Sequence, residues 1–307
     1  MRLGPVTVTP GVRADAFLIE GSRRTPVAPG TPSIGFSRLE TDLDPRASAR
    51  WVVSPRLTLT AAYGQYHQAP APEDLSAVFG TPDLSLSRAT HLTAGEALHV
   101  TDTLTTELVA FDKSLQDLVV RSRLTNPLLA RALTQSGEGH SDGLEVLVRQ
   151  ELAKGFFGWA SYTISRSERR FVGDPSWRLF DFDQPHVLSV VASQELGPWT
   201  FGLRFRYASG NPRTPVIGAT YDARDSRYDP VFGVQNSIRI PAFAQLDAKV
   251  ERLFVLGAAL RLSVYVDVEN VTNATNPEEI VYAQDFSRPG TISGLPILAV
   301  VGGRLWL

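Results

Sequence analysis

The stretch L-R-L-S-V-Y-V-D-V-E-N, residues Leu260 to Asn270, decides between the two folds open to this chain. Apolar residues occupy every second position: Leu260, Leu262, Val264, Val266 and Val268 alternate with Arg261, Ser263, Tyr265, Asp267 and Glu269. Because successive strand side chains point to opposite faces, the stretch predicts a strand with one apolar and one polar face. In a soluble sandwich the apolar face would enter a core, whereas in an outer-membrane barrel it would face lipid.

Composition removes several classes of protein. The 307 residues include 30 basic and 32 acidic ones, a formal net charge of -2, so the chain has no basic footprint for nucleic acid. It contains no cysteine, which excludes disulfides and a thiolate metal site. No stretch approaches the length of about 18 consecutive apolar residues that a transmembrane helix needs. A hydrophobic content of 43% fits a soluble protein or a barrel, because half of every barrel strand is polar.

The N-terminus carries no recognisable export signal. Met1-Arg2-Leu3-Gly4 leads straight into V-T-V-T-P-G-V-R, without the apolar segment and small-residue cleavage site of a signal peptide. Taken alone, this start predicts a cytoplasmic protein. Taken with a strand pattern that begins at residue 6, it predicts a chain whose upstream part is missing.

Twelve segments show complete or partial alternation of period two, and each predicts a strand. Their approximate bounds are Val6–Leu18, Pro45–Val53, Leu57–Tyr66, Ala89–Val100, Leu104–Val120, Asp142–Leu152, Phe156–Ser167, Pro185–Glu195, Phe201–Tyr207, Ala242–Phe254, Leu260–Asn270 and Ile297 to the terminus.

The connections between these segments alternate between long and short. Outer-membrane barrels have this pattern of long external loops and short periplasmic turns, whereas sandwiches do not require it. Trp51, Trp159, Trp199 and Trp306 lie near strand ends on the short-turn side, as an aromatic girdle would, and only Trp177 lies in a long loop. The sequence therefore predicts an all-β, antiparallel transmembrane barrel of about 12 strands, forming one domain over residues 1–307.

Unpaired strand edges are costly in lipid, where each unsatisfied backbone group costs several kcal/mol. We therefore expect the twelve strands either to close on themselves or to pair with strands supplied elsewhere.

Six segments stand out: F-D-K-S-L-Q-D-L-V-V at Phe111–Val120, Q-S-G-E-G-H-S-D-G-L-E-V at Gln135–Val146, S-Y-T-I-S-R-S at Ser161–Ser167, F-D-Q-P-H-V-L-S at Phe182–Ser189, A-S-G-N-P-R-T-P-V at Ala208–Val216 and V-D-V-E-N-V-T-N at Val266–Asn273. Together they resemble the C-terminal part of the barrel of TonB-dependent outer-membrane receptors. Their order and spacing cover most of residues 45–307.

The resemblance implies a partial barrel, because such receptors have 22 strands around an N-terminal plug domain, preceded by a signal peptide and a TonB-contacting segment. This chain carries none of these upstream parts, so the resemblance implies a truncated product or a fragment. The family often ends in an aromatic residue, whereas this chain ends in Trp306-Leu307.

Catalytic and metal-binding patterns have simpler explanations. Gly139-His140-Ser141-Asp142-Gly143 matches the G-x-S-x-G nucleophile elbow, but a strand follows it where a helix is required. Adjacent strand residues point to opposite faces, so His140 and Ser141 cannot form a base–nucleophile pair. The five histidines (His67, His91, His99, His140 and His186) are scattered, and Asp222, Asp225 and Asp229 lack the glycine and glutamate of an EF-hand. We predict no catalytic residue, metal site or cofactor.

Two sets of residues remain as candidates for function. Charged residues on the polar strand faces have mixed signs. They would face the plug in a complete receptor, or form ion-pair ladders or a water-filled pore in a self-closed barrel. They are Arg13, Asp15, Arg204, Arg206, Asp247, Lys249, Glu251, Arg261 and Asp267. Aromatic residues in the expected external loops could bind a ligand: Tyr66, His67, Trp177, Tyr221 and Tyr228.

The resemblance implies an outer-membrane receptor for uptake of a ligand such as a siderophore, cobalamin or glycan, in a Gram-negative bacterium. The expected partners are outer-membrane lipid, an unidentified small molecule, and TonB only if an upstream plug exists. Two alternatives remain open: an autonomous twelve-stranded diffusion channel for small polar solutes, and a barrel esterase or phospholipase. Hydrolysis lost in Ser141→Ala would favour the last.

Overall fold

The computed structural model describes residues 2–21, 36–127, 131–257 and 260–306. Over these residues it contains strands and no helix, and so none long and apolar enough to cross a membrane. The middle of the expected connection after the first strand (residues 22–35) and the terminal Leu307 lie outside the described residues.

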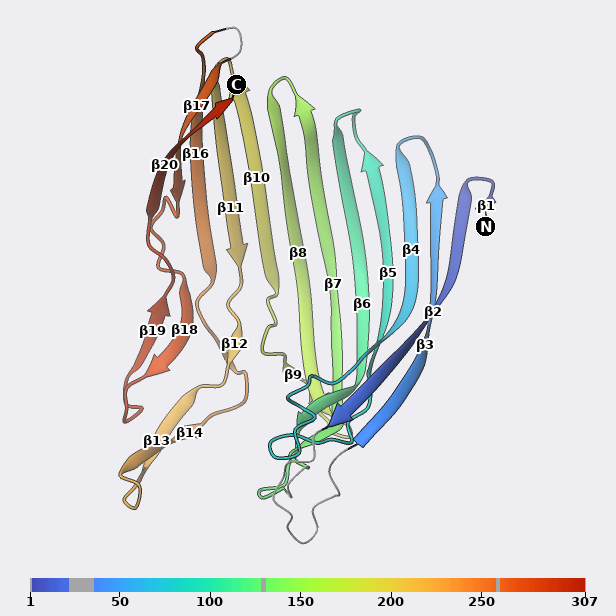
Figure 1. Ribbon diagram of the computed structural model, residues 1–307, viewed down its shortest axis with the longest axis vertical. Helices are drawn as coiled ribbons and strands as arrows, with labels where there is room; N and C mark the ends of the chain where they lie inside the picture. The colour runs from blue at the N-terminus through green and yellow to red at the C-terminus, as the bar shows by residue number, and fades with distance from the viewer. Residues whose placement is uncertain (1, 22–35, 128–130, 258–259, 307) are drawn as a thin grey trace. The chain divides into compact units, whose positions relative to one another are not determined.

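Twelve strands of nine or more residues run through the described chain, as the alternation predicted (Figure 1). They are β2 (Val6–Gly21), β3 (Phe36–Val52), β4 (Leu57–Gln68), β5 (Ser87–His99), β6 (Leu104–Arg121), β7 (Leu133–Ala153), β8 (Phe156–Phe171), β10 (His186–Leu196), β11 (Trp199–Ala208), β16 (Phe243–Val255), β17 (Arg261–Glu269) and β20 (Leu298–Trp306). The short pieces β1 (Arg2–Leu3) and β9 (Arg178–Leu179) pair with β2 and β8.

Each long strand lies beside its neighbour in the sequence, in the order β2-β3-β4-β5-β6-β7-β8-β10-β11-β16-β17-β20. Short turns join alternate pairs; at the β7–β8 turn Lys154 and Gly155 both have positive φ, +51° and +79°. Two residues with positive φ match the twist of an antiparallel hairpin. Contacts divide the chain into unit 1 (Met1–Gly95, Ala110–Asp142, Ser167–Arg178) and unit 2 (Glu96–Val109, Gly143–Arg166, Leu179–Leu307).

The distribution of buried side chains distinguishes a barrel from a sandwich. In the part of the chain that the structure describes, only Ile19, Leu84, Ala208 and Ile240 are buried hydrophobic side chains, against eight buried polar or charged ones. The apolar strand faces are exposed instead: Leu203 is 50% exposed and Val266 43%. A sandwich would bury these residues in a core, whereas a barrel presents them to lipid.

The polar faces carry paired charges. In unit 2, Arg204 of β11 lies opposite Asp247 of β16 and contacts its carboxylate at 2.6 Å. Lys249 contacts Glu251 at 2.9 Å, and Ser263 of β17 donates a hydrogen bond to Glu251. Ion pairs therefore connect charged residues on this face.

Several boundaries differ from the sequence prediction. β3 begins at Phe36 rather than Pro45, β7 begins at Leu133 rather than Asp142, and β8 continues to Phe171. These extensions lie at the long-loop ends, where the alternation is less regular. The G-x-S-x-G motif lies within β7, so the nucleophile elbow is absent there.

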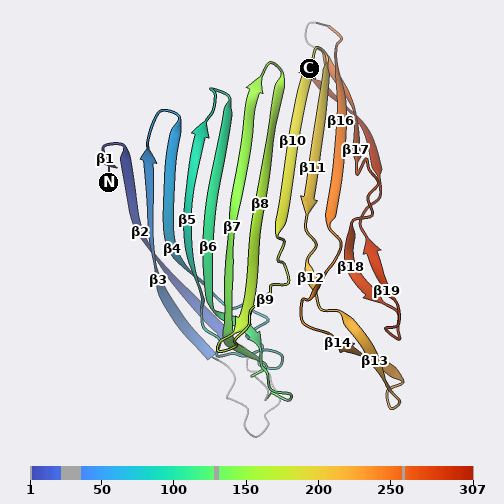
Figure 2. The ribbon, with the colours of Figure 1, turned by 180° about the vertical axis from the view of Figure 1, so that it is seen from behind.

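Two connections expected as loops contain hairpins. The connection between β11 and β16 includes β12 (Pro212–Arg213), β13 (Val216–Asp222), β14 (Arg227–Phe232) and β15 (Ile238–Arg239). The one between β17 and β20 includes β18 (Pro277–Tyr282) and β19 (Pro289–Ser293). Within unit 2, both hairpins extend from the same ends of their parent strands (Figures 1 and 2).

Candidate functional site

In unit 2 an ion pair with a buried carboxylate joins segments at one end of β10 and β11. Asp183, which is 2% exposed, accepts a hydrogen bond from the Arg239 guanidinium through its carboxylate. A second nitrogen of Arg239 donates to the carbonyl oxygens of Asp183 (2.6 Å) and Gly210 (3.0 Å). One guanidinium thus joins the segment before β10, the segment after β11 and β15. We call Asp183, Ser209, Gly210, Asn236 and Arg239 the rim anchor.

The remaining members of the rim anchor complete these links. Ser209 donates its N–H to the carbonyl oxygen of His186 (2.8 Å) and accepts the His186 N–H at its hydroxyl (3.2 Å). Asn236 is buried with a φ of +56°, and its side-chain amide donates to the Leu179 carbonyl oxygen and to Asp181 at 2.7 and 2.6 Å. Asparagine tolerates this left-handed conformation better than most residues.

A second ion pair connects the two hairpins of unit 2. Arg213 of β12 binds Glu279 of β18 through two parallel hydrogen bonds of 2.7 Å. The Tyr282 hydroxyl accepts the backbone N–H of Val216 at 3.2 Å. The Arg213 guanidinium lowers the pKa of the Glu279 carboxyl below its usual value.

Tyr221 and Tyr228, predicted to lie in an external loop, face each other across the β13–β14 hairpin. Their residues are register partners, and their ring centroids lie 5.0 Å apart. Both are exposed, Tyr221 at 54%. The pair is therefore an accessible aromatic surface on the β13–β14 hairpin.

In unit 1, Tyr66 and His67 both lie in β4, which ends at Gln68. The third strand was expected to end at Tyr66, so the prediction that His67 lies in a loop was wrong. β4 continues to Gln68, beyond Gly64, the last β4 residue paired with β3 (opposite Arg46). His67 contacts Asp44 through Nδ1 at 2.6 Å and Asp42 through Nε2 at 3.0 Å, and its side chain is 4% exposed. The Tyr66 ring packs against the imidazole ring of His91 and against the guanidinium of Arg46. His67 is thus held between two carboxylates, and it lines a cavity of about 330 Å³ together with Asp42 and Gln135.

Trp177 lies in the connection between β8 and β9, as expected. The Arg170 guanidinium lies over its ring at 4.3 Å and contacts Glu138 at 2.8 Å. Nearby in the sequence, Phe171 has two guanidiniums over its ring, Arg123 at 3.9 Å and Arg178 at 5.2 Å. The sequence prediction missed these three arginines.

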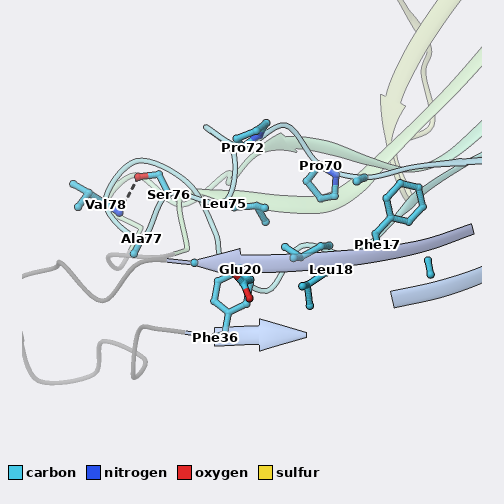
Figure 3. A pocket seen from close by; sticks show the side chains of 14 residues that line it. Phe17, Leu18, Glu20, Phe36, Pro70, Pro72, Leu75, Ser76, Ala77 and Val78 are labelled. Carbon is cyan, nitrogen blue, oxygen red and sulfur yellow. Dashed lines mark hydrogen bonds between the residues drawn. The ribbon is translucent and has the colours of Figure 1, made fainter. Parts of the chain in front are cut away.

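A cavity of about 660 Å³ lies in unit 1 between the end of β2 and the loop that follows β4. Figure 3 shows Pro70, Leu75 and Ser76 of the loop on one side and Leu18 and Glu20 of β2 on the other. The loop is held in place, because Arg38 of β3 donates to the carbonyl oxygens of Pro82 and Leu84. The volume is that of a small-molecule site. None of the five residues proposed from sequence lines it.

His140 and the aspartates of the β13–β14 arm contact neighbouring charged side chains. His140 lies 3.4 Å from Asp112 and 3.2 Å from Asp142, and no group of three or more His, Asp or Glu side chains there is arranged to hold a metal. Asp225 and Asp229 contact Arg227 instead.

Comparison with known families places this fold. A family model described as TonB dependent receptor-like, beta-barrel matches residues 1–271. The chain therefore belongs to the TonB-dependent receptor β-barrel family, and the resemblance of its six segments is confirmed. Its location is the outer membrane of Gram-negative bacteria. No curated protein matches the chain.

Solved structures share the fold. The ferric citrate transporter FecA is 20% identical, with a TM-score of 0.70, and the match covers 99% of this chain and 43% of FecA. The ferric-catecholate import receptor Fiu from E. coli is 14% identical, with a TM-score of 0.68 and coverage of 99% and 42%. The copper transporter OprC is 14% identical, with a TM-score of 0.69 and coverage of 99% and 46%. The chain spans less than half the length of each.

The segments that carry the family resemblance contribute to the anchors described above. Phe182–Ser189 contains Asp183, Ala208–Val216 contains Ser209, Gly210 and Arg213, and Val266–Asn273 contains Asn270. Asn270 is 2% exposed and donates its backbone N–H to the Asp247 carboxylate at 2.9 Å. Gly-Asn-Pro and the repeated asparagines are local sequence signals for turns at such sites. The Arg239–Asp183 and Arg213–Glu279 pairs join residues 56 and 66 positions apart, and no local sequence signal indicates them.

Proposed function

We propose that this chain forms part of an outer-membrane receptor that takes up a small metal chelate. The observation that carries the proposal is the exposed Tyr221–Tyr228 pair on a hairpin whose base is fixed by Arg239–Asp183 and Arg213–Glu279. A preorganised aromatic surface binds a ligand with little loss of conformational entropy.

The relatives support the choice of ligand class. FecA is a ferric citrate transporter, Fiu is a ferric-catecholate import receptor and OprC is a copper transporter. In unit 1, Trp177 and the guanidiniums over Phe171 add groups that bind anionic or aromatic ligands. The cobalamin and glycan possibilities stay within the proposal as ligands to be tested.

We also propose how uptake is coupled to energy. We propose a single barrel domain in this chain that is partial relative to a 22-stranded receptor, with TonB as a partner only through a plug supplied upstream of these strands. The role is transport, with no bond-making chemistry.

Uptake assays test this function. The protein is expressed from its natural gene in a Gram-negative host that lacks its own receptors. We expect this host to accumulate at least one of three ligands: ferric citrate, a ferric catecholate or a copper chelate. Tyr221→Ala/Tyr228→Ala should raise the apparent Kd about tenfold, because two aromatic contacts are lost. Val234→Ala, an exposed residue outside the pair, is the control.

Two results would contradict the proposal. One is uptake no greater than in the empty host for every chelate, cobalamin and maltodextrin. The other is ion conductance in planar bilayers together with uptake that persists without the proton motive force, which would favour the diffusion channel.

A further inference from the structure

The β18–β19 hairpin has little apolar packing of its own. Every residue of β19 is exposed, and Val281 and Ile292 are 39% and 50% exposed. A hairpin of two strands with no buried face is only marginally stable in water. Its position must therefore depend on specific polar contacts with neighbouring segments.

The base of the hairpin is fixed. Asn276 accepts the N–H of Ala244 at 2.8 Å, and Asn270 donates to the carbonyl oxygens of Ala274 and Leu295 at 2.9 and 3.0 Å. Asn270, Asn273 and Asn276 all have positive φ, between +41° and +53°. These contacts hold the segment that connects β17 to the hairpin, but they involve no residue of β18 or β19 themselves.

Beyond the base, two contacts tie β18 to the arm that carries β13 and β14. One is the forked Arg213–Glu279 pair and the other is the Tyr282 hydroxyl on the Val216 N–H. We propose that these contacts form a latch, in which the β18–β19 hairpin is docked on the β13–β14 arm through Glu279 and swings free when that carboxylate is neutralised. The latch consists of Arg213, Val216, Glu279 and Tyr282.

The charges around the latch set its dependence on pH. Arg213 faces Glu279 from β12, and Asp181, from the segment before β10, also attracts Arg213. From β18 itself, the neighbouring Ile280 N–H donates to the Glu279 carboxylate at 3.0 Å, and Tyr282 supplies a neutral phenol. Arg213 lowers the pKa of Glu279 from its usual value of 4.5, so the charged carboxylate stabilises the docked form fully at pH values above 4.5. It is lost as the pH falls through the lowered pKa.

Distances between spin labels test the latch, independently of any ligand. The chain has no cysteine, so Val231→Cys on β14 and Ile292→Cys on β19 can carry two nitroxides in the full protein reconstituted in lipid. We expect one narrow distance distribution at pH 7 and a broad one at pH 3. Glu279→Gln, which keeps the shape of the side chain, should raise the undocked fraction at pH 7 about fivefold, as expected for a half-exposed ion pair.

The matched control is Glu278→Gln, one residue earlier on the same strand. It should leave the distribution narrow at pH 7 and broad at pH 3. A Glu279→Gln protein with the wild-type distribution at pH 7 would overturn the proposal, as would equal broadening in the control. Because neither arm of the experiment involves a chelate, its failure would leave the proposed uptake function standing.

Discussion

Arg239→Met is expected to accelerate amide hydrogen exchange at the rim anchor by about a hundredfold. The substitution removes a guanidinium from a carboxylate that is 2% exposed, and breaking a buried pair from one side costs about 3 kcal/mol. The cost appears as local opening rather than global unfolding, because the anchor lies at the ends of the strands. The amides of Ser209 and Ile240, which bond across the anchor, are the reporters.

The companion variant for this experiment is Asp183→Asn combined with Arg239→Met. Removing both charges no longer leaves a carboxylate without its guanidinium, so the double variant should recover part of the protection. Exchange at Ser209 and Ile240 that is unchanged in Arg239→Met would show that the ion pair does not hold these segments together.

Gly210→Ala is expected to disrupt the same anchor by a steric route. A Cβ on Gly210 would lie 1.7 Å from the carbonyl oxygen of Ile240 and 2.6 Å from its carbonyl carbon, and backbone atoms cannot rotate away. Overpacking of this kind costs about 1–3 kcal/mol, and more where the backbone must move. We expect the β13–β14 arm to become sensitive to protease in intact outer membranes.

Gly218→Ala provides the matched control, since it lies in the same arm and a Cβ there would meet nothing within 4 Å. It should be cleaved at the wild-type rate. If Gly210→Ala were cleaved no faster than Gly218→Ala, the close approach of residues 210 and 240 would not be a constraint on the folded arm.

The strands could be predicted from sequence because their physical cause is local. Alternation such as that of Leu262, Val264 and Val266 needs only a lipid-facing surface and a polar one, and each strand shows it by itself. The prediction weakened at Phe36–Asp44, at Leu133–Ser141 and in the hairpins. These segments lie on the side of the long loops, where the alternation of apolar and polar residues is less regular.

The candidate site was less predictable because its contacts join distant residues. Tyr221 and Tyr228 were chosen as aromatic residues in a long connection, and the structure places them in register. His67 was chosen on the same grounds, but Asp42 and Asp44 bury it, and no local pattern reveals those partners. The forked contact of Arg213 with Glu279 spans 66 residues and was also beyond sequence reasoning.

Single-cysteine spin labelling tests most directly whether the apolar face of β17 faces lipid. Nitroxides at Val266→Cys and at Asp267→Cys, in the protein reconstituted in lipid, would be exposed in turn to oxygen, which concentrates in the bilayer, and to a water-soluble nickel chelate. Val266 lies on the exposed apolar face, whereas Asp267 lies opposite Lys249 on the charged face. We predict that oxygen preferentially relaxes the label at 266 and that nickel preferentially relaxes the label at 267. Equal access of nickel to both positions, or the reverse preference, would contradict a lipid-facing apolar surface on this strand.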